Sequence, residues 1–184
     1  MSGAARRGGW VVEQRVGTAG ALHRAWPSVE ADPTSRRVAV CRPTGPALVL
    51  GSTQPESLVD RAAAARRGLE VVRRRSGGGA VLVLPGDPLW IDVWLPADDP
   101  LFEDDVGRAF WWIGDAWAAG LRRVGLDGAR AVRRPAVRRG GDGEVACFGR
   151  ASSGEVVAAD GRKVVGLAQR RVRAGALFHG ACLL

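Results

Sequence analysis

The chain has 184 residues, of which 46% are hydrophobic and 25% are charged, and this balance indicates a globular protein and excludes a disordered one. The formal net charge of +8 at pH 7 indicates either an anionic partner or an arginine-rich surface without one. Apolar runs such as 80–85 are too short to span a bilayer, and the N-terminus lacks the apolar segment of a secretory signal. The three cysteines are far apart and form no CxxC pair, which argues against a disulfide framework and a zinc site.

These limits favour a single cytoplasmic domain over residues 1–184, in which 1–9 form a loose tail. Residues 27–36 are rich in Pro, Asp and Ser, which predicts a loop. The N-terminal half is expected to contain helices over Ala19–Trp26 and Pro55–Arg67 and strands over Arg37–Arg42, Ala47–Gly51, Leu69–Arg74, Ala80–Leu84 and Leu89–Leu95. The first two strands form a strand–turn–strand unit and the last two a hairpin around 85–88.

The clearest predicted helix covers Asp104–Val124. Its apolar residues recur at helical spacing and define one face, formed by Val106, Phe110, Ile113, Trp117 and Leu121. Acidic residues at its start and basic residues at its end suit the helix dipole. Because the tryptophans follow helical spacing and do not alternate with basic residues on strands, they indicate core packing and not a platform for nucleic-acid bases.

The C-terminal part of the chain predicts short strands. They cover Glu144–Phe148, Glu155–Ala159, Lys163–Arg171 and Ala176–Leu184, with Asp160-Gly161 as a hairpin signal between two of them. Strands and helices followed by an antiparallel set indicate an α/β or α+β domain with a mixed, mostly antiparallel sheet.

One lysine stands among many arginines. Lys and Arg together number 27, and Lys163 is the only lysine. An ammonium is a compact point charge, whereas a guanidinium is a wide planar fork. A single lysine therefore indicates either a site where only the smaller head fits or a residue retained by chance on the surface.

The stretch 73–83, RRRSGGGAVLV, places three cations and three glycines before a predicted strand. Glycines let a backbone approach a ligand closely, and successive N–H groups can form a cradle for an anion. The stretch is neither a P-loop nor a dinucleotide fingerprint, because it lacks GxxxxGK[ST] and leads into a strand. By itself it indicates an anion cradle or a plain tight turn.

Two separated segments resemble one known family. RRRSGGGAV resembles the RRxSGGGAV motif of the lipoate–protein ligase A family, within the biotin/lipoate protein ligase superfamily. GRKVVGLAQRR (161–171), ALFHGACLL (176–184) and ALVLGSTQ (47–54) resemble further segments of that family in the same order. The resemblance covers about residues 36–184.

The resemblance implies a fold like that of biotin protein ligases and class II synthetases, a mostly antiparallel sheet flanked by helices. It implies an ATP-dependent ligase that uses Mg²⁺ to activate lipoate or octanoate as an acyl-adenylate. The acyl group then passes to a lysine of an acidic lipoyl domain or glycine-cleavage carrier. Contact with nucleic acid or a membrane is not expected.

The resemblance also implies roles for individual residues. Lys163 matches the active-site lysine, whose ammonium stabilises charge that develops during acyl transfer. The residues expected to line the adenylate pocket are Arg73, Arg74, Arg75, Ser76, Gly77, Gly78, Gly79, Ala80, Gly166, Ala168 and His179. His179 either orients the ligand or caps its strand.

The sequence departs from the family pattern and leaves alternatives open. Residues 82–87 replace the His-Asp pair that follows GGGAV in many ligases, and the chain stops at Leu184, which indicates a minimal form or a missing C-terminal extension. In related octanoyltransferases that work without ATP, a cysteine shortly before GRK carries the acyl group as a thioester, and Cys147 stands at a compatible distance. Arg150 and Lys163 could lower the pKa of its thiol. If Cys147 carries no acyl group, it is a half-buried structural residue. Besides a ligase and a cysteine-dependent octanoyltransferase, the third alternative is a protein that only binds acyl-adenylate, nucleic acid or another anion.

Overall fold

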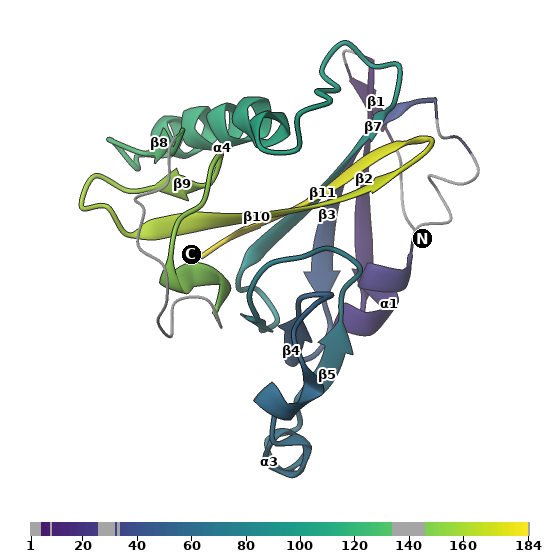
Figure 1. Ribbon diagram of the computed structural model, residues 1–184, viewed down its shortest axis with the longest axis vertical. Coiled ribbons are helices and arrows are strands. Elements are labelled where there is room, and N and C mark those ends of the chain that lie inside the picture. The colour runs from purple at the N-terminus through teal and green to yellow at the C-terminus, as the bar shows by residue number, and fades with distance from the viewer. Residues whose placement is uncertain (1–4, 8, 26–31, 33, 134–145, 184) are drawn as a thin grey trace.

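The computed structural model describes residues 5–7, 9–25, 32, 34–133 and 146–183, which form two β-sheets with helices beside them (Figure 1). The strands are β1 (Ala5–Arg7), β2 (Trp10–Gly17), β3 (Arg36–Pro43), β4 (Ala47–Leu50), β5 (Glu70–Arg73), β6 (Val81–Val83), β7 (Leu89–Pro96), β8 (Arg130–Ala131), β9 (Val156–Val157), β10 (Lys163–Val172) and β11 (Gly175–Cys182). The helices are α1 (Ala19–Arg24), α3 (Arg61–Arg66) and α4 (Trp111–Arg123), with 3₁₀ turns η1 (Glu56–Leu58), η2 (Arg108–Phe110) and η4 (Cys147–Gly149). None of these helices is long and apolar enough to cross a membrane.

The large sheet has eight strands in the order β1-β2-β3-β7-β11-β10-β9-β8. Its neighbouring strands pair antiparallel, apart from β2 and β3, which are parallel. The small sheet has the order β5-β4-β6, in which β4 pairs parallel with β5 and antiparallel with β6. The predicted α+β fold with a mixed, mostly antiparallel sheet flanked by helices is confirmed.

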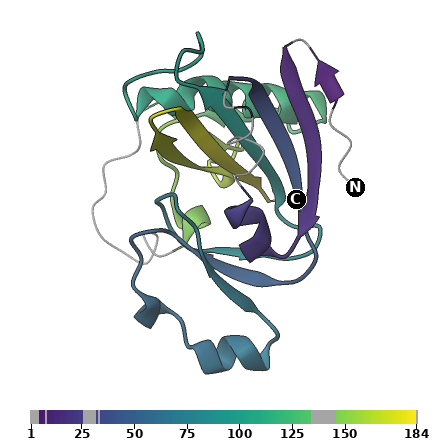
Figure 2. The same cartoon turned by 90° about the vertical axis from the view of Figure 1, so that its right-hand side faces the viewer.

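The large sheet separates two layers (Figures 1 and 2). Successive side chains of a strand point to opposite faces, and β7 shows this alternation. Val93 and Leu95 join the core beneath α4, whereas Trp90 joins a second core shared with α1 and the small sheet. Phe178 of β11 packs in the first core with Trp112 and Trp117, as predicted. Trp111 and Val106 are exposed instead, so the core prediction is wrong for these two residues. The small sheet and α1 therefore cover the face opposite α4.

The predicted hairpin around 85–88 is wrong, because its two strands belong to different sheets. The predicted strand–turn–strand unit is present as β3 and β4, and its strands also divide between the two sheets. The strand β3 lies in the large sheet and β4 in the small one, and the same holds for β7 and β6. The tight turn after β6 is present, since Leu84 and Asp87 form an antiparallel bridge. The longer strand β7 nevertheless pairs along its length with β3 and β11, and β6 pairs with β4. These crossings bring the small sheet over the large one.

Two predicted helices begin later than the sequence indicates, α3 after Asp60 and α4 after Phe110. The side chain of Asp60 accepts a hydrogen bond from the Ala63 N–H at 2.9 Å, so α3 begins at Arg61 and the residues before it form η1. The Asp105 carboxylate accepts hydrogen bonds from the N–H groups of Gly107 and Arg108 at 2.8 Å in the turn before η2, which in turn precedes α4. A side-chain cap therefore marks the start of α3, whereas α4 begins at Trp111 without one.

Other elements differ at the ends of the predicted segments. Residues 5–7 pair with β2, so this part of the expected tail is a strand, and the sequence analysis predicts neither β2 nor β8. Most of the predicted loop at 27–36 and residues 144–145 lie outside the described residues. Cys147 lies in the 3₁₀ turn η4, so its placement in a strand is wrong. The other predicted strands are confirmed with small shifts at their ends.

Candidate active site

The loop 74–80 wraps around the buried side chain of Arg74. This guanidinium donates hydrogen bonds to the carbonyl oxygens of Gly77 at 2.7 Å, Gly79 at 2.9 Å and Val49 at 3.4 Å. Gly78 has a φ of +97°, a backbone conformation that favours glycine. The arginine therefore fixes the glycine loop through its carbonyl groups, which is a role that the sequence analysis does not predict.

The neighbours of Arg74 point elsewhere. Arg73 donates to the carbonyl oxygens of Gly51 and Ser52 in the turn after β4, and Arg75 is exposed at the surface. Ser76 is buried and accepts, through its carbonyl oxygen, the Ser52 N–H at 2.9 Å. Of the three predicted cations, only Arg74 lines the cavities described below.

The end of the glycine loop holds Cys147 in place. The Cys147 N–H donates to the Ala80 carbonyl oxygen at 2.9 Å, and Ala80 pairs with Ala146 in a parallel bridge. On the other side, a Cβ built on Gly166 of β10 would lie 2.7 Å from the Cys147 sulfur. The two separated motifs thus meet at one cysteine, and Gly166 leaves the space that its thiol occupies.

Lys163 lies beside the same cysteine, at the first residue of β10. Its Nζ is 3.7 Å from the Cys147 Sγ and 2.7 Å from the Glu155 Oε2, and the side chains of this lysine and glutamate are only 4% and 5% exposed. The Lys163 ammonium also donates to the carbonyl oxygens of Cys147 and of Arg150. The only lysine of the sequence is therefore a buried cation next to a thiol, and not a residue retained on the surface.

The charges around Cys147 act on its thiol in opposite directions. Burial raises the pKa of Cys147 above its ordinary value, and Glu155 adds to this rise, whereas Lys163 and Arg74 lower the pKa. The net effect is a raised pKa, so the resting thiol is protonated at neutral pH. Arg74 lies far from Cys147 in the sequence, and its effect on this pKa is not expected from the sequence.

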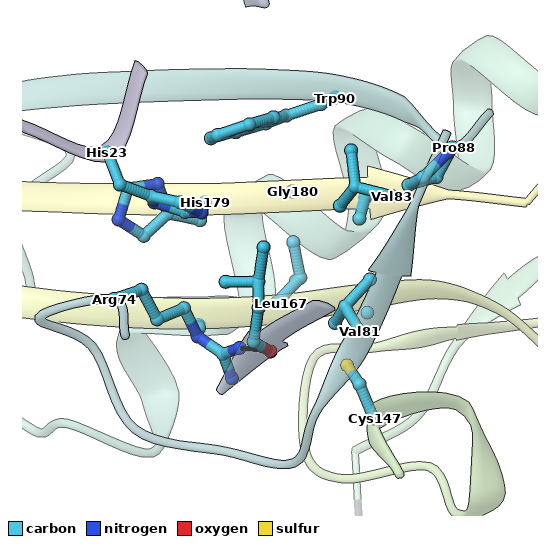
Figure 3. Close-up of a pocket in the computed structure, with 14 residues that line it drawn as sticks. His23, Arg74, Val81, Val83, Pro88, Trp90, Cys147, Leu167, His179 and Gly180 are labelled. Carbon is cyan, nitrogen blue, oxygen red and sulfur yellow. Dashed lines mark hydrogen bonds between the residues drawn. The ribbon is translucent and has the colours of Figure 1, made fainter. Parts of the chain in front are cut away.

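An apolar cavity opens beside the Cys147 sulfur. Figure 3 shows the cysteine on one side of it, His23 and His179 on the opposite side, and Trp90 with Leu167 between them. Gly166 and Ala168 also line this cavity, as predicted for a small-residue surface under a ligand. The free volume is about 40 Å³, and the walls are mostly aliphatic and aromatic.

A second, polar cleft of about 460 Å³ reaches Cys147 from the other side. Lys163, Glu155 and Arg150 line it together with the glycines of the loop, Gly78 and Gly79. Cys147, Arg74 and Leu167 line both the cavity and the cleft. The thiol therefore stands where an apolar cavity meets a polar cleft.

Sequence reasoning misses a buried polar network at the far wall of the cavity. The Asp92 carboxylate of β7 accepts a hydrogen bond from Trp90 Nε1 at 2.6 Å and lies 2.6 Å from His179 Nδ1. His23 stacks 4.4 Å from Trp90, centroid to centroid, and burial lowers its pKa to about 3. The network orients His179 at the wall of the cavity, which supports the alternative that this residue orients a ligand over the alternative that it caps its strand. The one signal in the sequence is a lone Asp inside the apolar run LWIDVWL.

We expect the glycine loop to depend on Gly78. Gly78→Val forces a β-branched residue to a φ of +97° and sets its Cβ 3.0 Å from Arg74 Nη2. The strain should lower the free energy of unfolding by about 2 kcal/mol in urea denaturation. Gly77→Ala is the matched control, because a Cβ there meets no atom within 4 Å and its φ is not positive. Equal unfolding free energies for the two variants would contradict the assignment of the loop.

The structure resembles lipoate ligases of known structure. A putative lipoate protein ligase from Thermoplasma acidophilum with bound lipoic acid matches with a TM-score of 0.71 and 21% identity, over 93% of this chain and 64% of that protein. A lipoate-protein ligase A bound with ATP matches with a TM-score of 0.67 and 23% identity, over 93% of this chain and 66% of that one. At these identities the likeness shows the fold.

Curated relatives match at higher identity. The octanoyltransferase LipM of Moorella thermoacetica is 36% identical over 143 residues, 76% of this chain and 50% of that protein. The octanoyltransferase LipM of Kyrpidia tusciae is 35% identical over 128 residues, 68% of this chain and 46% of its own. The chain thus spans about half the length of the curated relatives it matches.

These relatives correct the expected enzyme class. Six of them carry the name octanoyltransferase, and none of the six is named a ligase. A transferase takes an acyl group that its donor has already activated, so it has no step that requires ATP. The assignment as an ATP-dependent lipoate–protein ligase is therefore wrong.

The family itself is shown by a match over most of the chain. The model of the lipoyl protein ligase A/B catalytic domain matches residues 24–184, which include the glycine loop, Cys147 and Lys163. The chain belongs to the lipoyl protein ligase A/B catalytic domain family.

Proposed function

We propose that the protein transfers an octanoyl or lipoyl group from an acyl thioester to a lysine of a lipoyl-domain carrier, through a thioester on Cys147. The observation that carries this proposal is the position of the Cys147 sulfur, where the apolar cavity meets the polar cleft, 3.7 Å from the Lys163 ammonium. The curated octanoyltransferases among the relatives support the class of reaction.

The first half-reaction moves the acyl group onto the protein. Cys147 loses its proton and attacks the thioester carbonyl of the donor as a thiolate. The donor sulfur leaves as a thiolate and takes up one proton, in place of the one that Cys147 has lost, so one thioester and one thiol replace another such pair. The buried Lys163 ammonium faces the carbonyl oxygen as negative charge develops on it. The raised pKa of Cys147 keeps the thiol protonated until a donor enters.

The second half-reaction releases the acyl group to the carrier. The neutral amine of the carrier lysine attacks the Cys147 thioester, an amide forms, and the sulfur leaves and recovers a proton. The amine must approach through the polar cleft, since the other side of Cys147 is the apolar cavity. A net charge of +8 favours the acidic carrier expected from the sequence.

The acyl chain is assigned to the apolar cavity. Its walls include the apolar side chains of Val81, Val83 and Trp90. The one polar group of these side chains, the indole N–H of Trp90, donates a hydrogen bond to Asp92. A volume of about 40 Å³ holds little more than a water molecule's share of liquid, so the walls must move apart when an eight-carbon chain enters. Gly166 and Ala168 set the small-residue side of this cavity.

The proposal assigns the remaining predicted residues to support. Arg74 and the glycines 77–79 shape the loop, Ala80 holds Cys147, and Ser76 and Arg73 fasten the loop to the turn after β4. ATP and Mg²⁺ have no part in the proposed reaction. The cytoplasmic location, the single domain and an acidic lipoyl-domain or glycine-cleavage carrier stay predictions.

The test is a transfer assay on the whole chain. The protein is incubated with an octanoyl thioester and a purified lipoyl domain, with and without ATP, and the mass of the lipoyl domain is measured. The proposal expects one octanoyl group on the carrier lysine at the same rate in both reactions. Donor binding without transfer would favour the binding-only alternative, and transfer from free octanoate only with ATP would contradict the proposal.

A further inference from the structure

Glu155 is a buried carboxylate for which the proposed reaction gives no role. It lies in the turn before β9, and the residue is 4% exposed. One carboxylate oxygen, Oε1, accepts the Leu167 N–H at 3.0 Å, and the other, Oε2, accepts the Ser152 N–H at 2.6 Å. Each carboxylate oxygen is therefore fixed by a backbone N–H group, one from β10 and one from the segment after η4, independently of Lys163.

The same carboxylate fixes the Lys163 ammonium. An ammonium has three N–H donors and no acceptor. Around Nζ stand three oxygen acceptors, namely Glu155 Oε2 at 2.7 Å, the Arg150 carbonyl at 3.1 Å and the Cys147 carbonyl. The three donors thus have three oxygens to bind, and the Cys147 sulfur lies 3.7 Å from the same Nζ.

This arrangement matches the three N–H donors of an ammonium with three oxygen acceptors. A neutral amine has only two N–H donors and would leave one buried oxygen without a partner, at a cost typical of an unsatisfied polar group. It would also leave the Glu155 carboxylate as a buried charge without a counter-ion. The Lys163 ammonium is thus fixed by these oxygens at 3.7 Å from the Cys147 sulfur.

From these contacts we propose that Glu155 is a positioning residue that holds Lys163 as a fixed cation beside Cys147 and, as an anion, restrains ionisation of the thiol. The expected effect of Glu155 on acyl transfer rests on the proposed function, whereas its expected effect on the ionisation of the Cys147 thiol does not. Removing the carboxylate should make Cys147 easier to ionise and yet slow the transfer, because Lys163 loses its fixed place.

The electrostatic part concerns a small set of groups. The charges that act on Cys147 are Lys163 and Arg74, which favour the thiolate, and Glu155, which opposes it. Arg150 also lines the cleft at this point, and His23 and His179 line the cavity on the far side of the cysteine. Only Glu155 among these groups is an anion, so its neutralisation has a predictable sign.

The test measures the thiol directly, with no acyl donor. The rate at which iodoacetamide alkylates the Cys147 peptide is followed by mass spectrometry as a function of pH in the wild type, Glu155→Gln, Lys163→Met and the double variant. We expect the midpoint to fall by about one pH unit in Glu155→Gln and to rise in Lys163→Met. The double variant should lie between these two. Glu70→Gln is the control, because that carboxylate accepts the Gly20 N–H and does not line the cleft.

The transfer assay supplies the second reading. Glu155→Gln should lower kcat by about tenfold while KM for the donor stays close to that of the wild type, because the amide no longer fixes the ammonium. In the Lys163→Met background the same change should have no further effect on kcat, since a residue that acts through Lys163 cannot act without it. A structural role alone would change stability and leave the alkylation midpoint where it is.

Stability is measured on the same four proteins. Lys163→Met leaves a buried carboxylate unpaired and should melt below the double variant, in which neither charge is present. If Glu155→Gln alone does not fold, the comparison of Lys163→Met with the double variant still gives the effect of Glu155 on the midpoint. A midpoint unmoved by Glu155→Gln in both backgrounds overturns the inference. Absence of transfer in the wild type contradicts the proposed function and leaves the alkylation result to decide on Glu155.

Discussion

Replacing Cys147 with serine should abolish acyl transfer, with a fall in kcat of at least about 1,000-fold. A serine hydroxyl needs an adjacent base to become a nucleophile at neutral pH. The nearest charged neighbour is the Lys163 ammonium, which already donates to oxygens and takes up no proton. The measurement is the rate of octanoyl transfer to a lipoyl domain under saturating donor, with circular dichroism to show that the variant is folded.

The matched control for this variant is Cys182→Ala. Cys182 is also a free and buried cysteine, but it belongs to the core beneath α4 and does not line the cavity or the cleft. Its replacement should cost some stability and leave kcat within about twofold of the wild type. Transfer that persists in Cys147→Ser would remove the cysteine from the reaction and with it the proposed mechanism.

Substitution of Lys163 should have the second-largest effect. Lys163→Arg keeps the charge but replaces a compact head with a planar fork, and the three oxygens around Nζ leave a place for a point charge. We expect kcat to fall by about 100-fold, because a guanidinium cannot reproduce the fixed point charge that Lys163 places beside the developing oxyanion. Steady-state transfer kinetics and urea denaturation of the variant are the measurements.

The neutral substitution Lys163→Ala separates charge from folding. It leaves the Glu155 carboxylate buried without its counter-ion, so the free energy of unfolding should fall by about 3 kcal/mol in addition to the loss of transfer. Arg162→Ala is the control, because Arg162 is next to Lys163 in the sequence but its side chain is exposed and pairs with Asp160 at the surface. Wild-type kcat in Lys163→Arg would contradict the argument from the single lysine.

The elements of the fold were largely predictable, but their pairing was not. Local signals such as the apolar period around Ile113 and the Pro-Gly turn at 85–86 identify helices and strands from neighbouring residues. The division into two sheets depends on contacts between β7 and β11, which are far apart in the chain. A hairpin signal therefore locates the turn after β6 without showing which strands pair on either side of it.

The candidate site was predictable where a motif repeats a known pattern. Lys163, Cys147 and the glycine loop could be named from their segments, because resemblance depends on short runs of residues. Asp92 and Glu155 could not, since each matters through partners brought close by folding. Arg74 shows a third case, because its position was predicted while its bonds to the loop carbonyls required the structure.

The central claim is that Cys147 carries the acyl group during transfer. The most direct measurement is the mass of the tryptic peptide containing Cys147 after the protein is mixed with an octanoyl thioester in the absence of a carrier, quenched in acid and digested. We predict a single octanoyl group on that cysteine, lost again when a lipoyl domain is added before the quench. Octanoylation of the carrier with the Cys147 peptide unmodified at every time point would contradict the account.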